Sequence, residues 1–369
     1  MDVLTLSIPT QHDYSDPTVE LDPARLQRWV ADLPQMNVRE TVRLVSSALS
    51  ALNEQRIDMS LRYRCLEVYR PAVQRLFETV GPLQIRQISM STGQRHETIA
   101  AAADLFDSLA NGYKLIVMEQ QGAGLITGEA INRAVGALCF VLQDCFRYYR
   151  SVPPRVFSDL HRLYDHARRA GLLDVPSLAG ADQQDLSTAG LYKLGMLLSL
   201  TDPDRLAEGE LGLLADVLRE HIDSCRVVQG GSWTGNGQGV FLLDIDSDAR
   251  PVACATLTSP AEIATPYLLD ATDLLRALRA RLDEIPERVR QRSPEAMVLQ
   301  RLQPAEHGAS QRREQRHRDG RWVGLVLGLE GIHAQLMRAS GGNSRDAATS
   351  SHSPRASRVV DSSESGMKL

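Results

Sequence analysis

The sequence predicts a mainly α-helical protein with an N-terminal multi-helix domain, a small α/β module and a C-terminal β segment. Three observations in the 369-residue chain predict this order. Apolar residues recur at helical spacing over residues 22–225. A glycine-rich loop and a short apolar run then open residues 226–302, which is typical of a strand that follows helices. Residues 303–369 hold a short apolar run and serine-rich polar chain, so we expect strands and loops there.

Helix starts define the beginning of the multi-helix domain. Residues 1–21 are polar, and we expect a flexible N-terminus. At Asp22-Pro23 an aspartate that can cap a helix precedes a proline, which suits the first helical position. The same pairing recurs at Asp202-Pro203, Ser259-Pro260 and Ser293-Pro294. Repeated starts of this kind predict a chain of many separate helices.

Apolar stripes predict where these helices pack. Together with helical patterns at residues 91–120 and 153–171, they predict about eight helices with short connections over residues 22–225. The stripes are Val42, Val45, Leu49 and Leu52; Leu66, Tyr69, Val73, Leu76 and Val80; Ile131, Val135, Leu138, Leu142, Cys145 and Tyr149; and Leu211, Leu214, Leu218 and Ile222.

The α/β module follows a flexible loop at residues 230–239. The run at 240–245 reads as a buried strand, with 252–257 as its expected partner. Helical patterns at 268–285 and 294–302 complete the module.

Two short signatures in the C-terminal segment carry the functional prediction. Arg312 and Arg316 form an Arg-x-x-x-Arg before the strand-like run 322–327. Asp361, Ser363 and Gly366 form an Asp-x-Ser-x-x-Gly, which occurs once in the chain. Arginine pairs bidentately with guanine and with phosphate oxygens, and a carboxylate can accept hydrogen bonds from the guanine N1–H and N2–H₂ edge.

In this order the two signatures resemble those of PilZ domains, the β-barrels that bind the bacterial second messenger cyclic di-GMP. The resemblance implies that Arg312 and Arg316 grip guanine and phosphate, with Arg313 as a secondary phosphate contact. It also implies that Asp361 and Ser363 read a guanine edge and that Gly366 shapes a turn. Stretches of the helical domain resemble larger proteobacterial proteins that end in a PilZ domain, at residues 29–34, 48–53, 112–115 and 197–206.

The PilZ-like segment departs from a complete barrel in two ways. Residues 340–357 are rich in serine and glycine, and we interpret them as a disordered insertion between the first strands. The sequence ends just after the second signature, so we expect only the first strands of an incomplete PilZ-like β-barrel.

Composition limits the other classes of function. The net charge of −5 argues against a general nucleic-acid binder, and no apolar run approaches the length of a membrane span. Five scattered cysteines read as reduced, buried thiols, and no signal peptide is seen, so we expect a cytoplasmic protein.

Other candidate sites are rejected on spacing. Glycines at 235–239 precede a strand, whereas phosphate-binding glycines follow one. His161 and His166 are five apart, off the spacing that aims two ligands at one metal. Asp244, Asp246 and Asp248 fit a polar turn better than a metal site. We expect no metal and no cofactor.

Two functions remain open. The first is a non-enzymatic cyclic di-GMP effector that couples the second messenger to an unidentified protein partner through a helical scaffold. The alternative is a helical protein–protein interaction scaffold whose truncated PilZ segment binds nothing.

Overall fold

The chain forms two compact units in the computed structural model, Met1–Pro304 and Ala305–Leu369. Each is described by itself. The structure describes residues 4–13, 19–34, 37–80, 92–119, 125–175, 186–207, 209–230, 237–256, 266–291, 293–302, 322–325, 355–358, 361–363 and 366–368.

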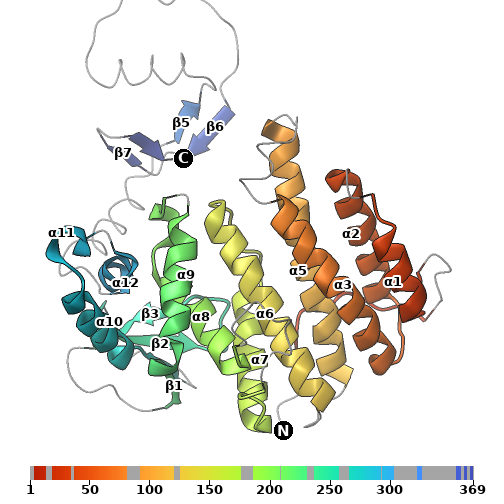
Figure 1. Ribbon diagram of the computed structural model, residues 1–369, viewed down its shortest axis with the longest axis horizontal. Helices are drawn as coiled ribbons and strands as arrows, with labels where there is room; N and C mark the ends of the chain where they lie inside the picture. The colour runs from red at the N-terminus through yellow and green to blue at the C-terminus, as the bar shows by residue number, and fades with distance from the viewer. Residues whose placement is uncertain are drawn as a thin grey trace, which may run out of the picture. The chain divides into compact units, whose positions relative to one another are not determined.

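The first unit is built mainly from α-helices that lie side by side, as Figure 1 shows. This confirms the predicted mainly α-helical class. The helices described are α1 (Pro23–Ala31), α2 (Val38–Glu54), α3 (Met59–Val80), α5 (Thr92–Glu119), α6 (Leu125–Arg147), α7 (Val156–Ala170), α8 (Thr188–Leu200), α9 (Glu210–Glu220), α10 (Thr272–Glu284), α11 (Glu287–Arg290) and α12 (Pro294–Leu302).

Two of the predicted helix starts have the expected side-chain cap. The Asp22 carboxylate accepts a hydrogen bond from the backbone N–H of Ala24 at 2.9 Å, with proline at the first position of α1. The Ser293 hydroxyl accepts from the N–H of Ala296 at 3.2 Å at the start of α12. Asp202-Pro203 instead begins a short 3₁₀ helix without a side-chain cap.

The apolar stripes form one continuous core. Every residue of the four predicted stripes is buried or packs against the core except Tyr149, which is 57% exposed. Helix α6 ends at Arg147, and Tyr149 has a left-handed backbone with φ of 53°. The helical period therefore stops before this residue, and the prediction that Tyr149 belongs to the stripe is wrong.

A four-stranded antiparallel sheet follows the helices. Its strands are β1 (Arg226–Gln229), β2 (Val240–Asp244), β3 (Val252–Ala253) and β4 (Pro266–Asp270), in the order β1-β4-β2-β3. The predicted pairing of the runs at 240–245 and 252–257 is confirmed, although β3 is short and passes into a 3₁₀ helix at Cys254–Thr256.

Strand β4 corrects the helix predicted over residues 268–285. Tyr267, Leu268 and Leu269 are all at most 7% exposed, because β4 lies between β1 and β2 and is covered on both faces. A strand buried on both faces shows an apolar run instead of alternation, which cannot be told from a helix by its period. The Asp270 carboxylate accepts from the N–H of Thr272 at 2.9 Å, and the helix begins there.

The sheet and the helices belong to the same compact unit, Met1–Pro304. The Tyr267 hydroxyl donates to the Asp165 carboxylate of α7 at 2.6 Å. Lys193 of α8 donates to the carbonyls of Ile222 and Cys225 at 2.9 and 3.0 Å. Strands β2 and β4 contribute to the same apolar core as the helices.

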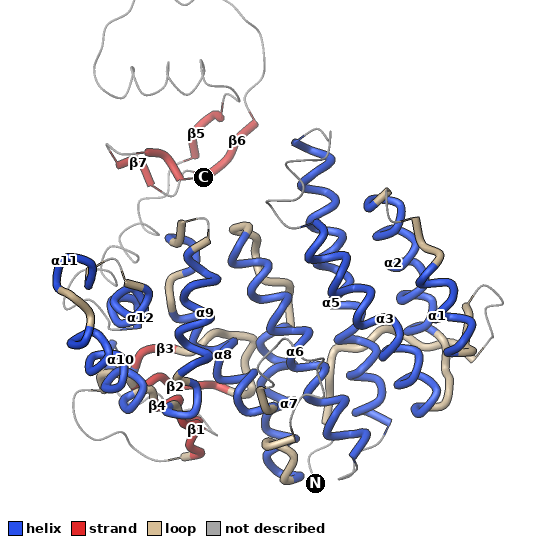
Figure 2. Tube along the Cα trace, viewed as in Figure 1, coloured by secondary structure: helices blue, strands red, loops and turns tan. Residues whose placement is uncertain are grey.

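The second unit contains two antiparallel strand pairs, and Figure 2 labels three of their strands, β5, β6 and β7. Strand β5 (Trp322–Leu325) pairs with β6 (Arg355–Arg358), and β7 (Asp361–Ser363) pairs with β8 (Gly366–Lys368). The strand predicted at 322–327 is thus present over its first four residues. Strand β6 includes residues 355–357, which were assigned to the disordered insertion, because their backbone pairs with β5. Residues 340–354 lie outside the described part of the chain.

Candidate functional site

The second signature lies on one strand pair. Asp361 and Ser363 are the first and last residues of β7, and Gly366 begins β8. Ser363 is directly opposite Gly366 in the antiparallel register, and Asp361 is opposite Lys368. Gly366 has no side chain and so allows another group to approach the backbone of β8 closely. The three residues are therefore brought together at one short hairpin.

The arginines of the first signature, Arg312, Arg313 and Arg316, lie outside the described residues. The structure consequently places three of the six predicted ligand residues by their backbone. The strand that follows the first signature, β5, is described, and its partner β6 immediately precedes the second signature in the chain.

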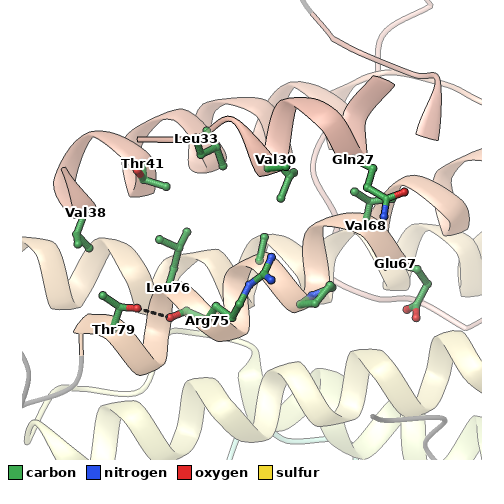
Figure 3. A pocket seen from close by; sticks show the side chains of 13 residues that line it. Gln27, Val30, Leu33, Val38, Thr41, Glu67, Val68, Arg75, Leu76 and Thr79 are labelled. Atoms are coloured by element: carbon green, nitrogen blue, oxygen red, sulfur yellow. Dashed lines mark hydrogen bonds between the residues drawn. The ribbon is translucent and has the colours of Figure 1, made fainter. Parts of the chain in front are cut away.

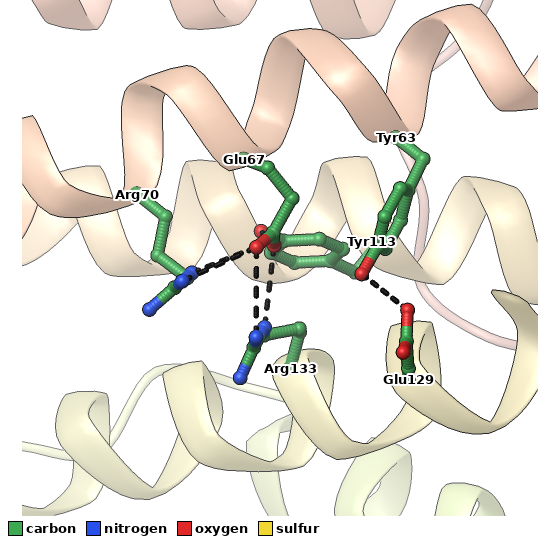
Figure 4. A network of polar contacts seen from close by, with 6 residues as sticks. All are labelled: Tyr63, Glu67, Arg70, Tyr113, Glu129 and Arg133. Atoms are coloured by element: carbon green, nitrogen blue, oxygen red, sulfur yellow. Dashed lines mark hydrogen bonds and ion pairs between the residues drawn. The ribbon is translucent and has the colours of Figure 1, made fainter. Parts of the chain in front are cut away.

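In the helical unit, a polar network centred on Glu67 links α3, α5 and α6 (Figure 4). Glu67 accepts hydrogen bonds from Tyr113 at 2.6 Å, from Arg133 at 3.2 Å and from Arg70 at 3.2 Å. Beside it, Tyr63 donates to Glu129 at 2.6 Å and packs edge-to-face on Tyr113. We call these six residues the Glu67 network.

The charge of Glu67 is neutralised within this network. Burial on its own raises the pKa of the Glu67 carboxyl, but the hydrogen bond from Tyr113 and the charges of Arg133 and Arg70 outweigh it and lower the pKa below the ordinary value. Burial also raises the pKa of Tyr113 well above its usual range, so this phenol stays a neutral donor. Side chains from three helices are thus held in a fixed arrangement.

A groove lies between α1, the start of α2 and α3, with a volume of about 860 Å³. Figure 3 shows side chains of α1 and α2 facing those of α3 across it. We call it the α1–α3 groove. Its apolar lining is Val30, Ala31, Leu33, Val38, Val68, Pro71, Ala72 and Leu76, and its polar lining is Gln27, Thr41, Glu67, Arg75 and Thr79.

Two of the polar lining residues are already engaged. The Thr41 hydroxyl donates to the carbonyl of Pro34 at 2.7 Å, and the Thr79 hydroxyl donates to the carbonyl of Arg75 at 2.8 Å. Glu67 belongs to the Glu67 network, so α3 is fixed on its inner side by the same residue that lines the groove.

The helical unit also decides the family. The family described as cyclic-di-GMP receptor FimW, N-terminal domain, matches residues 24–230, more than half of the chain. The chain belongs to this FimW N-terminal domain family. The curated cyclic-di-GMP receptor FimW of Pseudomonas aeruginosa is 25% identical over 346 residues, which cover 89% of this chain and 56% of that relative. The chain therefore spans less than two thirds of the length of the curated relative. No solved structure matches.

The resemblance stated from the sequence, to cyclic di-GMP receptors with a large helical N-terminal region, is confirmed by the FimW family match. The match to the FimW domain covers the described helices from α1 to α9 and the first strand, β1, whereas α10, α11 and α12 lie beyond it. Both the Glu67 network and the α1–α3 groove lie inside it.

Sites that the sequence rejected have structural roles in this FimW-family chain. The Asp248 carboxylate accepts from the N–H groups of Arg155 and Ser158 and so caps α7, while Asp244 accepts from the N–H of Asp246 at 3.2 Å. The expected polar turn is confirmed. Buried His161 contacts the Tyr192 hydroxyl at 2.7 Å and the Ala249 carbonyl at 3.0 Å. Among the described residues, no group of three or more potential ligands could hold a metal ion.

Helix α2 carries another Arg-x-x-x-Arg, and both of its arginines form solvated surface pairs. Arg39 pairs with Glu97 at 3.5 Å and Arg43 with Glu40 at 2.7 Å, and all four side chains are more than a third exposed. All five cysteines are buried and free of disulfides. In the described part of the chain, no helix is long and apolar enough to cross a membrane.

Sequence reasoning missed the buried polar pairs of the FimW domain. Lys114 and Asp159 form an ion pair at 2.8 Å with both side chains 3% exposed, and the backbone N–H of Ser7 also donates to Asp159. A lysine inside the apolar run at 113–118 was a usable signal, because a buried charge needs a partner. Its partner lies 45 residues away on another helix, which the sequence does not reveal.

Proposed function

We propose that this FimW-family protein is a cyclic di-GMP-binding effector whose helical unit couples the second messenger to a protein partner. The observation that carries the proposal is membership of the FimW N-terminal domain family, together with a relative that is named a cyclic-di-GMP receptor. The two C-terminal signatures support it, because they supply the groups that guanine and phosphate need.

The proposed site joins the two signatures of the second unit. Arg312 and Arg316 present guanidinium forks to guanine and phosphate, and Arg313 adds a phosphate contact. Asp361 and Ser363 read the guanine edge from the β7–β8 hairpin, where Gly366 forms the return of the chain. Strand pairing of β5 with β6 supports this arrangement, because it ties the segment after the arginines to the segment before Asp361.

Three further properties belong to the proposal. The protein is a non-catalytic receptor, as the name of its relative suggests. It is bacterial and cytoplasmic, which five free thiols support because disulfides are rare in reducing compartments. The C-terminal segment, residues 303–369, is PilZ-like.

The test is isothermal titration of cyclic di-GMP into the full-length gene product, with cyclic di-AMP as the control. We expect saturable binding of cyclic di-GMP at one site and much weaker binding of cyclic di-AMP. Absence of binding would contradict the effector and leave the alternative, a helical interaction scaffold. The α1–α3 groove is the observation that favours this second candidate.

A further inference from the structure

The α1–α3 groove presents apolar side chains at the surface of the first unit. Eight of its thirteen lining residues are apolar or small, and no element in the described part of the chain fills it. Val68 and Leu76 are only partly buried at its wall, and Pro71 and Ala31 are exposed. The groove therefore offers a partner protein apolar side chains that it could cover on binding.

The shape of the groove suits a helix. Its α3 wall runs from Glu67 to Thr79, which is roughly 18 Å along a helix axis at 1.5 Å per residue. A partner helix of about three turns would span this length, with apolar residues three and four apart facing the groove. Three helices form the walls, α1 with the start of α2 on one side and α3 on the other (Figure 3).

Proline in the middle of α3 adds a polar feature to the same wall. Pro71 has no N–H, so the carbonyl of Glu67 lacks the donor that position i+4 normally supplies. Residues 67 and 71 both line the groove. Pro71 therefore interrupts the backbone hydrogen bonding of α3 within the groove wall.

The charges on the groove decide what kind of helix fits. Two charged residues line it, Glu67 and Arg75. The carboxylate of Glu67 is paired with Arg70 and Arg133, whereas exposed Arg75 has no side-chain hydrogen bond or ion pair among the described residues. The unpaired charge is positive, so a complementary occupant carries a carboxylate beside its apolar stripe.

We infer that the α1–α3 groove binds an amphipathic helix of a partner protein that carries an acidic residue next to its apolar face. This inference names the kind of partner that the proposed effector would bind. Its biological role rests on the proposed function, but the binding itself does not. A second copy docked groove to groove would bring another unpaired Arg75 into the interface, and its one lining carboxylate, Glu67, is already paired with Arg70 and Arg133.

The test uses the full 369-residue chain and two designed 14-residue helical peptides as probes. Both carry leucines at i, i+4 and i+7, with glutamate beside the stripe in one and lysine at the same position in the other. Fluorescence anisotropy measures their binding. We expect the glutamate peptide to bind about threefold to tenfold more tightly, and Arg75→Glu to reverse the order, as expected for exchanging an attractive charge pair for a repulsive one.

Two further variants complete the experiment. Val68→Asp places a charge on the apolar wall, and we expect it to weaken both peptides by more than about 10-fold. Arg64→Glu changes an exposed arginine of α3 outside the groove lining, and we expect it to leave the peptide preference unchanged. Circular dichroism melts verify that each variant is folded. If Val68→Asp unfolds the protein, Arg75→Glu still tests the inference, because Arg75 is exposed and its substitution should not disturb the core.

Two results would overturn the inference. The first concerns the peptides: neither peptide binds saturably, or Arg64→Glu changes the peptide preference as much as Arg75→Glu does. The other is a dimer of the parent chain in sedimentation that Val68→Asp dissociates, which would assign the groove to a second copy. Cyclic di-GMP titration of the same variants separates this inference from the proposed receptor function, because a groove variant that loses the peptide should still bind the nucleotide.

Discussion

At the scale of residues, the two C-terminal arginines carry the strongest prediction. Arg312→Ala or Arg316→Ala should weaken cyclic di-GMP binding by about 10- to 150-fold, because a hydrogen bond to a charged group contributes about 1.5–3 kcal/mol. Arg316→Lys should lose most of that affinity, since an ammonium cannot present a planar fork. Isothermal titration of the full-length gene product measures both.

The matched control for this prediction lies elsewhere in the chain. Arg288→Ala changes an arginine of helix α11, outside both signatures, and should leave binding unchanged. Asp361→Ala should reduce affinity for cyclic di-GMP while leaving weak cyclic di-AMP binding nearly the same. Equal losses in all variants would contradict the assigned roles.

A buried histidine makes the stability of the helical unit depend on pH. Burial lowers the pKa of His161 below its usual value of 6.5, although the hydrogen bond to the Ala249 carbonyl and the charges of Asp244 and Asp248 oppose this shift. Burial is also the main cause that lowers the pKa of His166. The unfolded chain therefore binds more protons below pH 6.5. Stability is full above that pH and decreases as the pH falls toward the folded pKa values, by up to about 1.4 kcal/mol per pH unit for each histidine.

Urea unfolding at pH 7.5, 6.5 and 5.5 measures this dependence. The urea concentration at the unfolding midpoint should decrease when the pH is lowered from 6.5 to 5.5. His161→Gln should reduce this pH dependence in part, because His166 still contributes to it. An unchanged slope in His161→Gln would show that the neutral state of His161 does not contribute.

At the scale of elements, helix α7 depends on a cap from a distant turn. The Asp248 carboxylate accepts from the N–H of Ser158 at 3.0 Å and from that of Arg155, although ninety or more residues separate them. Asp248→Ala should destabilise the unit by about 0.5–2 kcal/mol, the usual effect of losing an N-cap. Asp246→Ala, on the same turn and exposed, should have little effect. Chemical denaturation measures the free energy of unfolding of both variants. Equal losses of stability would contradict the capping role of Asp248.

Most helices could be predicted from the sequence, and the sheet only in part. The stripes of α2, α3, α6 and α9 were visible because each helix buries one face. Strand β4 was missed because both of its faces are buried, which removes the alternation, and β1 because it has four residues that are mostly exposed.

The candidate sites divide in the same way. The two signatures are local and readable, and the sequence placed Asp361, Ser363 and Gly366 in a region that the structure shows as a strand pair. The Glu67 network joins residues 46 and 66 positions apart, and the α1–α3 groove is lined by three helices. Such sites depend on how helices pack, which spacing along one helix does not determine.

At the scale of the whole molecule, the shared core predicts how far the first unit can be shortened. A chain of residues 1–304 should melt cooperatively, because the sheet, α10 and α12 pack on the same core as the helices. Truncation at residue 225 deletes Tyr267, which donates to Asp165, and Asp248, which caps α7. It also exposes buried leucines of α9. Circular dichroism should show a lower and broader transition. An identical transition would mean that residues 1–225 fold independently.

The strand order β1-β4-β2-β3 also determines when this unit can finish folding during translation. Strand β1 pairs with β4 alone, and β4 ends 41 residues after β1 ends, at Asp270 against Gln229. Until β4 has left the ribosome, β1 has no neighbour, and the apolar side chains that β4 later covers stay exposed to water. Non-local pairing of this kind slows folding and leaves aggregation-prone intermediates. The nascent chain should thus depend most on chaperones just before residue 270 emerges.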